Sequence, residues 1–166
     1  FVVQVTFLPD IINSLEGLEG YGNLGWLIVG IAGIPSSILW MRWAHKYGSI
    51  NIIIIAMALQ ILGILIPTFS TNVMLNLMSG ALYGSTFIGL VALFLNLGGQ
   101  LAGKNPVVLM GAMTAAYGIG QVGAPLYSVA LIEYFGNYNS TLYVTALIVF
   151  VGILFLLYAK KVETIK

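Results

Sequence analysis

Hydroxyl and amide side chains in residues 107–131 have the spacing that places them on one side of an α-helix. At about 100° per residue, four of them share one narrow sector: Thr114, Tyr117, Gln121 and Ser128. Such groups bind a polar ligand through hydrogen bonds, and they lack the ionisable side chains that a proton relay uses inside a membrane. The pattern therefore indicates a ligand-binding helix face rather than a proton path.

A second face of the same segment carries almost no side chain. Small residues recur at every fourth position: Ala112, Ala116, Gly120, Ala124 and Ser128. Small residues let two helix backbones approach closely in a membrane. We therefore expect another helix to pack tightly on this face.

Pro125 predicts a bend in this helix. A proline ring lacks an amide hydrogen and collides with the carbonyl four residues earlier, which belongs to Gln121. The bend would then lie at the largest polar side chain of the segment. Polarity, small residues and a proline together predict that residues 107–131 form the wall of a cavity.

Residues 73–97 have the same two-sided design, which makes them the expected neighbour of that wall. One sector is polar, and glycines thin the adjacent faces. The polar sector holds Asn76, Ser79, Tyr83 and Thr86, and the glycines are Gly80, Gly84 and Gly89. Together with Gln4, near the start of the chain, these polar residues complete the set of cavity candidates.

The cavity candidates have structural alternatives. Gln121 could serve only as an interhelical hydrogen bond, which contributes about 0.6 kcal/mol on average in membranes. Tyr83 and Tyr117 could fill space beside glycines instead of presenting their hydroxyls to a ligand. The sequence leaves these possibilities open.

The composition excludes an ordinary soluble domain. The chain has 166 residues, of which 60% are hydrophobic and 7% charged, and its mean hydropathy is +1.02, so we predict an all-α integral membrane protein. Its six Lys and Arg residues form no basic patch for nucleic acid. With no cysteine, one histidine and five acids, the chain has little to build a metal site, a cofactor site or a catalytic triad. We do not expect an enzyme.

Hydropathy predicts five full transmembrane helices preceded by a partial one. A spanning helix needs about 20 apolar residues, and the first apolar stretch has about half of that, so we interpret the chain as the later part of a longer protein. The partial span covers residues 1–12. The full spans cover residues 21–41, 50–69, 73–97, 107–131 and 141–159.

Prolines and one asparagine predict local geometry. Pro35 should kink the first full span without breaking it, because the serines that follow can satisfy a freed carbonyl. Pro67 should end the second full span. Asn105 should cap the helix that begins at Pro106.

The basic residues predict the orientation. With five full spans, all six fall on one side of the membrane: Arg42, Lys46, Lys104, Lys160, Lys161 and Lys166. Cytoplasmic loops are enriched in Lys and Arg. We therefore expect the C-terminus in the cytoplasm.

The turn at residues 41–48, MRWAHKYG, resembles the signature turn of the major facilitator superfamily, Gly-x-x-x-Asp-Arg-x-Gly. Lys46 takes the basic position and Gly48 the closing glycine. The turn departs from the signature because Met41 replaces the first glycine and His45 replaces the aspartate. This puts in doubt any cytoplasmic lock built on that carboxylate.

Two residues of the turn and one later segment also bear on the resemblance. Arg42 adds a second fixed cation to the turn, and His45 could either sense cytoplasmic pH or be a surface residue at the interface. Residues 118–125, GIGQVGAP, are similar to the eleventh helix of bacterial members of the superfamily.

The resemblance implies the second half of a transporter, from the end of the seventh helix through the twelfth, forming one six-helix bundle in a bacterial inner membrane. Helices seven, eight, ten and eleven would line a central cavity, and nine and twelve would face lipid. A small molecule of unknown identity would move by alternating access between this bundle and a facing one. The facing bundle would be the N-terminal half.

Two other functions remain open at the level of sequence. The chain could be a half-size transporter that works with a second copy of itself. It could also be a non-transporting membrane module that docks a partner through its small-residue faces.

Overall fold

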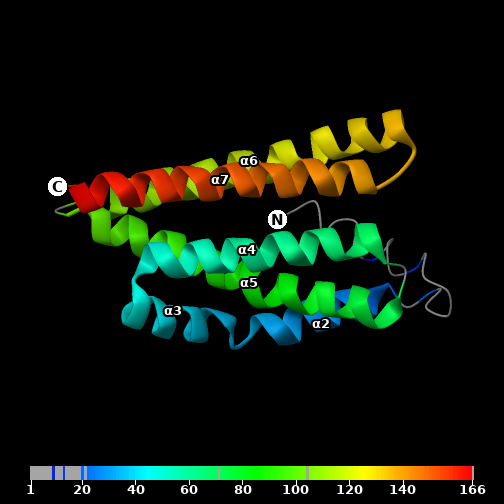
Figure 1. The fold of residues 1–166 in the computed structure, drawn as a ribbon, viewed down its shortest axis with the longest axis horizontal. Coiled ribbons are helices and arrows are strands. Elements are labelled where there is room, and N and C mark those ends of the chain that lie inside the picture. The colour runs from blue at the N-terminus through cyan, green and yellow to red at the C-terminus, as the bar shows by residue number, and fades with distance from the viewer. Residues whose placement is uncertain are drawn as a thin grey trace.

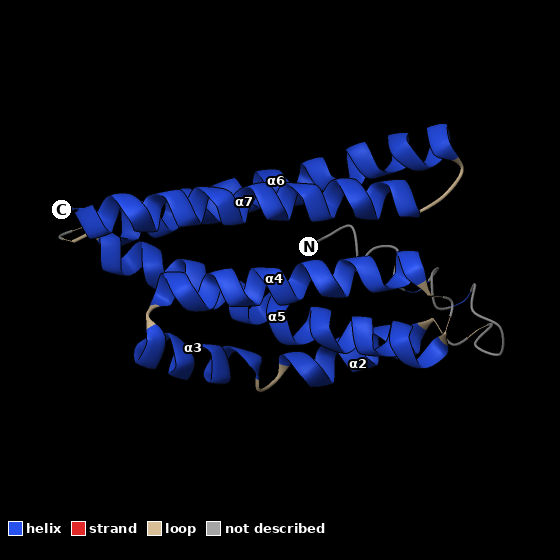
Figure 2. Ribbon diagram, viewed as in Figure 1, coloured by secondary structure: helices blue, strands red, loops and turns tan. Residues whose placement is uncertain are grey.

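The described residues of this computed structural model form a bundle of α-helices (Figure 1). They comprise residues 9, 13, 20, 22–70, 72–103 and 105–165. Within them there are helices and turns but no strands (Figure 2). The helices are α2 (Asn23–Gly33), α3 (Ser36–Tyr47), α4 (Ser49–Phe69), α5 (Val73–Leu101), α6 (Pro106–Phe135) and α7 (Asn139–Ile165).

Five helical spans are long and apolar enough to cross a membrane, with α2 and α3 together forming the first of them, Asn23–Tyr47. This confirms the prediction of an all-α membrane protein with five full transmembrane helices. The partial span at residues 1–12, including Gln4, lies outside the described residues.

The bundle is built around α4 and α5. Helix α5 contacts α2, α3, α4 and α6, whereas α4 contacts α3, α5 and α7. Helices α6 and α7 run side by side along one edge of the bundle, and α2 and α3 lie along the opposite edge (Figure 1). Helix α6 is therefore peripheral to the packing, although its sequence has the same two-sided design as that of α5.

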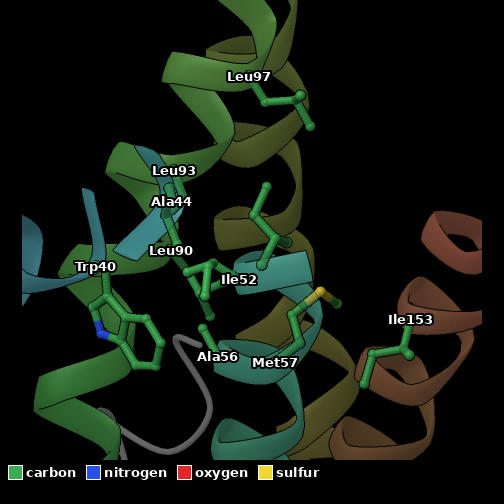
Figure 3. Packing of buried hydrophobic residues seen from close by; sticks show 10 residues of the cluster. Trp40, Ala44, Ile52, Ala56, Met57, Leu90, Leu93, Leu97 and Ile153 are labelled. Carbon is green, nitrogen blue, oxygen red and sulfur yellow. The ribbon is translucent and has the colours of Figure 1, made fainter. Parts of the chain in front are cut away.

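The main hydrophobic core lies where α3, α4, α5 and α7 meet (Figure 3). Trp40 anchors it, because its ring is buried and its Nε1 donates a hydrogen bond to Ser85 O at 2.6 Å. A Cβ at Gly89 would collide with the Trp40 ring. The glycine therefore provides the space into which the indole packs.

The first full span is interrupted at Ile34 and Pro35, which corrects the expectation of a continuous kinked helix. Pro35 has no amide hydrogen to donate to Ile31 O four residues earlier. The Ser36 hydroxyl donates to Gly33 O at 2.7 Å. The serine thus binds a carbonyl of the same turn, although not that of Ile31, and the helix is interrupted at the proline.

The other helix ends also differ in part from expectation. Pro67 lies inside α4 and does not end it, because α4 continues to Phe69. Asn105 occupies the N-cap position of α6 without a capping hydrogen bond from its side chain. A side-chain cap is found at α5, where Asn72 Oδ1 accepts from the amides of Met74 and Leu75 at 2.9 and 3.3 Å.

The connections are shorter than hydropathy indicates. Helix α3 continues through Tyr47, so Gly48 alone separates it from α4, with a φ of 90° that favours glycine. Helix α5 extends to Leu101, and α6 extends to Phe135 before Gly136 ends it in the left-handed conformation. Polar residues that the sequence placed in turns are therefore helical.

Candidate functional site

Tyr117 and Gln121 form a hydrogen-bonded polar pair in the predicted cavity wall on α6. Gln121 Nε2 donates a hydrogen bond to Tyr117 Oη at 2.8 Å. The residues are four positions apart, so they lie one above the other on the same helix face. Gln121 is exposed and Tyr117 is half-buried. We call this pair, with the cavities around it, the Tyr117–Gln121 site.

Three cavities adjoin the pair, and each contains Tyr117, Gln121 or both in its lining. One of about 410 Å³ lies between α5 and α6 and includes Tyr117. One of about 480 Å³ lies between α4, α6 and α7 and includes both residues. The third, of about 410 Å³, lies between α2, α5 and α6 and includes Gln121. The pair therefore lies where the cavities meet, and each volume falls within the range of small-molecule sites.

The two ends of the polar sector on α6 have partners within the protein. Thr114 is exposed, and its Oγ1 donates to Met110 O at 2.9 Å, although it also lines the cavity between α5 and α6. Ser128 is buried, and its Oγ donates to Ala124 O at 2.6 Å. The centre of the sector, at Tyr117 and Gln121, is the part best placed to contact a ligand.

Polar residues of α5 face the interior of the bundle. Ser79 Oγ donates to Gly63 O of α4 at 2.6 Å, and the Thr86 hydroxyl is hydrogen bonded to Gln60 of α4. Asn76 Nδ2 donates to the carbonyls of Ser70 and Asn72 at 2.8 and 3.0 Å. The exposed fractions of Asn76, Ser79 and Thr86 are at most 1%. The structure does not bring these three candidates to the cavities.

Tyr83 is the α5 candidate that does reach the site. Its ring is buried and stacks on Phe87, with centroids 5.5 Å apart and an interplanar angle of 12°. Tyr83 and Gln121 line the same cavity between α2, α5 and α6. Tyr83 is therefore the residue through which α5 contributes one of its predicted candidates to a cavity shared with α6. Gln4 lies outside the described residues.

Trp26 and Gln60 were not among the predicted site residues. Trp26 lines the cavity shared by Tyr83 and Gln121. Gln60 is the one polar residue in the interior of an otherwise apolar span, and it is fully buried against Thr86. Its Oε1 is hydrogen bonded to Thr86, whereas its Nε2 has no partner among the described residues. A lone amide within an apolar span was the available signal, because buried amides usually have hydrogen-bond partners.

The small residues of α6 do not pack as expected. A Cβ added at Gly111, Gly118, Gly120 or Gly123 would meet open space within the described part of the protein. The close approach occurs instead at Gly84 of α5, where a Cβ would collide with the backbone of Val29 in α2. Of the predicted stripe, Ala112, Ala116 and Gly120 are exposed, whereas Ala124 and Ser128 pack against α4 and α7, so the expected close packing holds only at its C-terminal end in the part of the chain described.

The predicted signature turn lies at one end of the bundle. Met41, Arg42, His45 and Lys46 belong to α3, and Gly48 is the link to α4. Lys160 of α7 reaches the same end, because its Nζ donates to Asn51 Oδ1 at 2.6 Å. The end of α7 and the α3–α4 junction lie together (Figure 1). The cations of α3 and α7 thus share one end.

The site is built for noncovalent recognition. In the part of the chain that the structure describes, no charged residue lines the three cavities around the Tyr117–Gln121 pair. Among the residues that the structure describes, no group of three or more His, Cys, Asp or Glu side chains could hold a metal ion. The available chemistry consists of hydrogen bonds from an amide and phenols, together with contacts to aromatic and aliphatic surfaces.

Comparison with known families supports the resemblance to the major facilitator superfamily. The family model described as "Uncharacterised MFS-type transporter YbfB" matches residues 1–157. Comparisons with curated proteins and with solved structures found no match. Because the family match covers nearly the whole chain, this integral membrane protein belongs to the YbfB-type family of major facilitator superfamily transporters.

Proposed function

We propose that this chain forms one bundle of a secondary transporter that moves a small molecule by alternating access, with the substrate bound at the Tyr117–Gln121 site. Membership of a transporter family establishes transport in general. The observation that carries the finer proposal is the position of the Gln121–Tyr117 hydrogen bond, exposed on α6 where three cavities meet. An amide and a phenol at such a junction can hold and orient a ligand.

The open face of α6 supports a second bundle as the other wall of the site. Gly111 and Gly118 lie within about 80° of Gln121 around the helix axis, and both meet open space within the described residues. In alternating access, two bundles rock around a site at their interface. A face with few side chains and one polar pair suits such a contact, because it can bind ligand and still slide. We propose the N-terminal six-helix half as the facing bundle.

We also propose an orientation for the bundle. The cationic ends of α3 and α7 lie together, and the positive-inside rule assigns that end to the cytoplasm. The protein would then lie in the inner membrane of a bacterium, with its C-terminus in the cytoplasm. The α6–α7 connection, at the other end in Figure 1, would face outward.

Ligand-dependent stabilisation of the purified full-length protein tests the site. Thermal unfolding is measured across a compound panel for the wild type, Gln121→Ala and Tyr117→Phe. Gln100→Ala is the matched control, because Gln100 is an exposed amide on α5 that contacts Ser49 at the end of α4. The ligand-induced shift should fall in both site variants and persist in the control. Unchanged shifts in both site variants would remove the site assignment.

Accessibility measurements test alternating access. The chain has no cysteine, so a single cysteine at Gly120 provides a specific label once the rest of the protein is also free of cysteine. In an alternating-access transporter, substrate should change the rate at which membrane-impermeant maleimide reaches this position from each side. A substrate-independent rate, with no uptake into proteoliposomes, would instead favour a docking module.

The half-size alternative is tested by stoichiometry. Native mass spectrometry of the transport-competent protein gives the number of copies in each particle. One copy with two six-helix halves supports the proposal, whereas two copies of a six-helix chain would replace the N-terminal half with a second copy.

A further inference from the structure

The cavity between α2, α5 and α6 has an aromatic lining. Trp26 of α2 and the stacked Tyr83 and Phe87 of α5 line it, together with the Gln121 amide of α6. The cavity volume is about 410 Å³. Aromatic surfaces favour flat ligands that can stack offset or edge to face. The shape and chemistry of this wall therefore suit a planar ring system.

The charge of the lining restricts the ligand further. Among the described residues, none that lines the three cavities around the Tyr117–Gln121 pair is charged. Moving an ion out of water is costly unless an opposite charge or several hydrogen bonds replace its hydration. Aromatic faces compensate a cation only in part. The lining therefore favours an uncharged ligand over either an organic cation or an anion.

The hydrogen-bonding capacity of the Tyr117–Gln121 pair indicates which polar groups a ligand would carry on the edge that faces the pair. Gln121 Nε2 donates to Tyr117 Oη at 2.8 Å, which leaves the phenol hydrogen available to donate. Gln121 Oε1 is an acceptor on the same exposed amide. The pair thus offers one donor and one acceptor close together. A ligand with an adjacent acceptor and donor, as in a cyclic amide, would complement both.

We infer that the substrate is an uncharged, planar aromatic or heteroaromatic molecule with a hydrogen-bond donor and acceptor side by side. The ring would lie against Trp26 and Phe87, with the buried Tyr83 stacked on Phe87. Its polar edge would meet Gln121 in the same cavity and reach Tyr117, which lines the two adjoining cavities. This inference rests on the proposed function, because it takes the Tyr117–Gln121 site as the substrate site.

Four bicyclic probes of similar size separate the possible ligand classes. They are 2-quinolinone, which has the donor–acceptor edge; quinoline, which lacks the donor; N-methylquinolinium, a cation; and quinoline-2-carboxylate, an anion. Binding to the full-length protein in lipid nanodiscs is measured by calorimetry. We expect 2-quinolinone to bind about tenfold or more tightly than either charged probe, and about threefold more tightly than quinoline.

Two matched pairs of variants locate the binding. Phe87→Leu should weaken 2-quinolinone about three- to tenfold, whereas Phe155→Leu, an exposed aromatic on α7, should leave its affinity unchanged. Gln121→Ala should reduce the preference for 2-quinolinone over quinoline, and Gln100→Ala should not. Equal effects within either pair would overturn the inference.

The outcomes distinguish this inference from the proposed function. If a charged probe binds more tightly than 2-quinolinone and Gln121→Ala weakens that binding, the substrate class is wrong but the proposed site stands. If none of the probes binds, the substrate class is overturned. The compound panel then decides the proposed function separately, through the response of ligand-induced stabilisation to Gln121→Ala.

Discussion

Helices α5 and α6 have similar sequence patterns but use their polar faces differently. On α5, Ser79 and Thr86 are fully buried and bind Gly63 and Gln60 of α4. On α6, the exposed Gln121 binds Tyr117 of the same helix. The α5 face holds the bundle together, whereas the α6 face remains available to a ligand or to a second bundle.

Prolines make the contrast sharper. Pro67 cannot donate to Gly63 O four residues earlier, and Ser79 of α5 supplies a hydrogen bond to that carbonyl. Pro125 in turn withdraws the helical donor from Gln121 O. One proline creates an acceptor for a neighbouring helix inside the bundle. Pro125 leaves a carbonyl without its helical donor in α6, on the helix that carries the exposed pair. The bend of α6 at this proline stays a prediction.

Glycines show the same difference in packing. Gly84 of α5 lies directly against the backbone of Val29, and Gly89 lies against Trp40. Gly118 and Gly120 of α6 meet open space within the described residues. These glycines therefore have a packing role on α5, whereas Gly118 and Gly120 of α6 have none within the described residues.

The largest expected effect distinguishes these glycines. Gly84→Ala should lower the free energy of unfolding by about 3 kcal/mol, because a backbone cannot move aside as a flexible side chain can. Gly120→Ala should leave stability unchanged or raise it by about 0.5 kcal/mol, because alanine favours the helix and meets no neighbour. Reversible unfolding in detergent measures both. Equal destabilisation would abolish the packing contrast.

The next effect concerns the buried hydroxyl. Thr86→Val should cost about 1–2 kcal/mol of stability, because it leaves the buried Gln60 Oε1 without the hydroxyl that contacts it. Thr114→Val on α6 should cost about 0.5 kcal/mol or less, since that exposed hydroxyl binds only its own helix. A larger loss from Thr114→Val would show that the α6 face is already packed.

Ligand affinity, unlike stability, should depend on the polar face of α6 and not on that of α5. Tyr117→Phe should weaken substrate binding about three- to tenfold with little change in stability, because the phenol lies at the cavities. Ser79→Ala should leave affinity unchanged, because its hydroxyl is committed to Gly63 O. Parallel calorimetry and unfolding of both variants measure this. Weaker binding in Ser79→Ala alone would reverse the assignment.

The smallest effect is expected at the proline inside α4. Pro67→Ala restores a helical donor to Gly63 O and thereby competes with Ser79. We expect a stability change of about 0.6 kcal/mol or less, the average for an interhelical hydrogen bond in membranes. Combining it with Ser79→Ala should give no further loss. An additive loss would show that the two residues do not share this acceptor.

Much of the architecture could be predicted from the sequence, for a reason specific to membranes. Backbone groups in lipid must be bonded within the helix, so long apolar segments become helices. The pairing of Tyr117 with Gln121 follows as well, because residues four apart share a helix face. Local periodicity thus predicted the spans and placed the central pair on one surface.

Tertiary structure alone decided which faces meet. Periodicity gives the angular position of a side chain on its own helix, but not the rotation of one helix against the next. In lipid, a polar face and a small-residue face can both pack, so the burial of Ser79 and Thr86 against α4 could not be distinguished from exposure to a cavity. Gln60 and Trp26 were missed for the same reason: their roles depend on residues that only folding brings near.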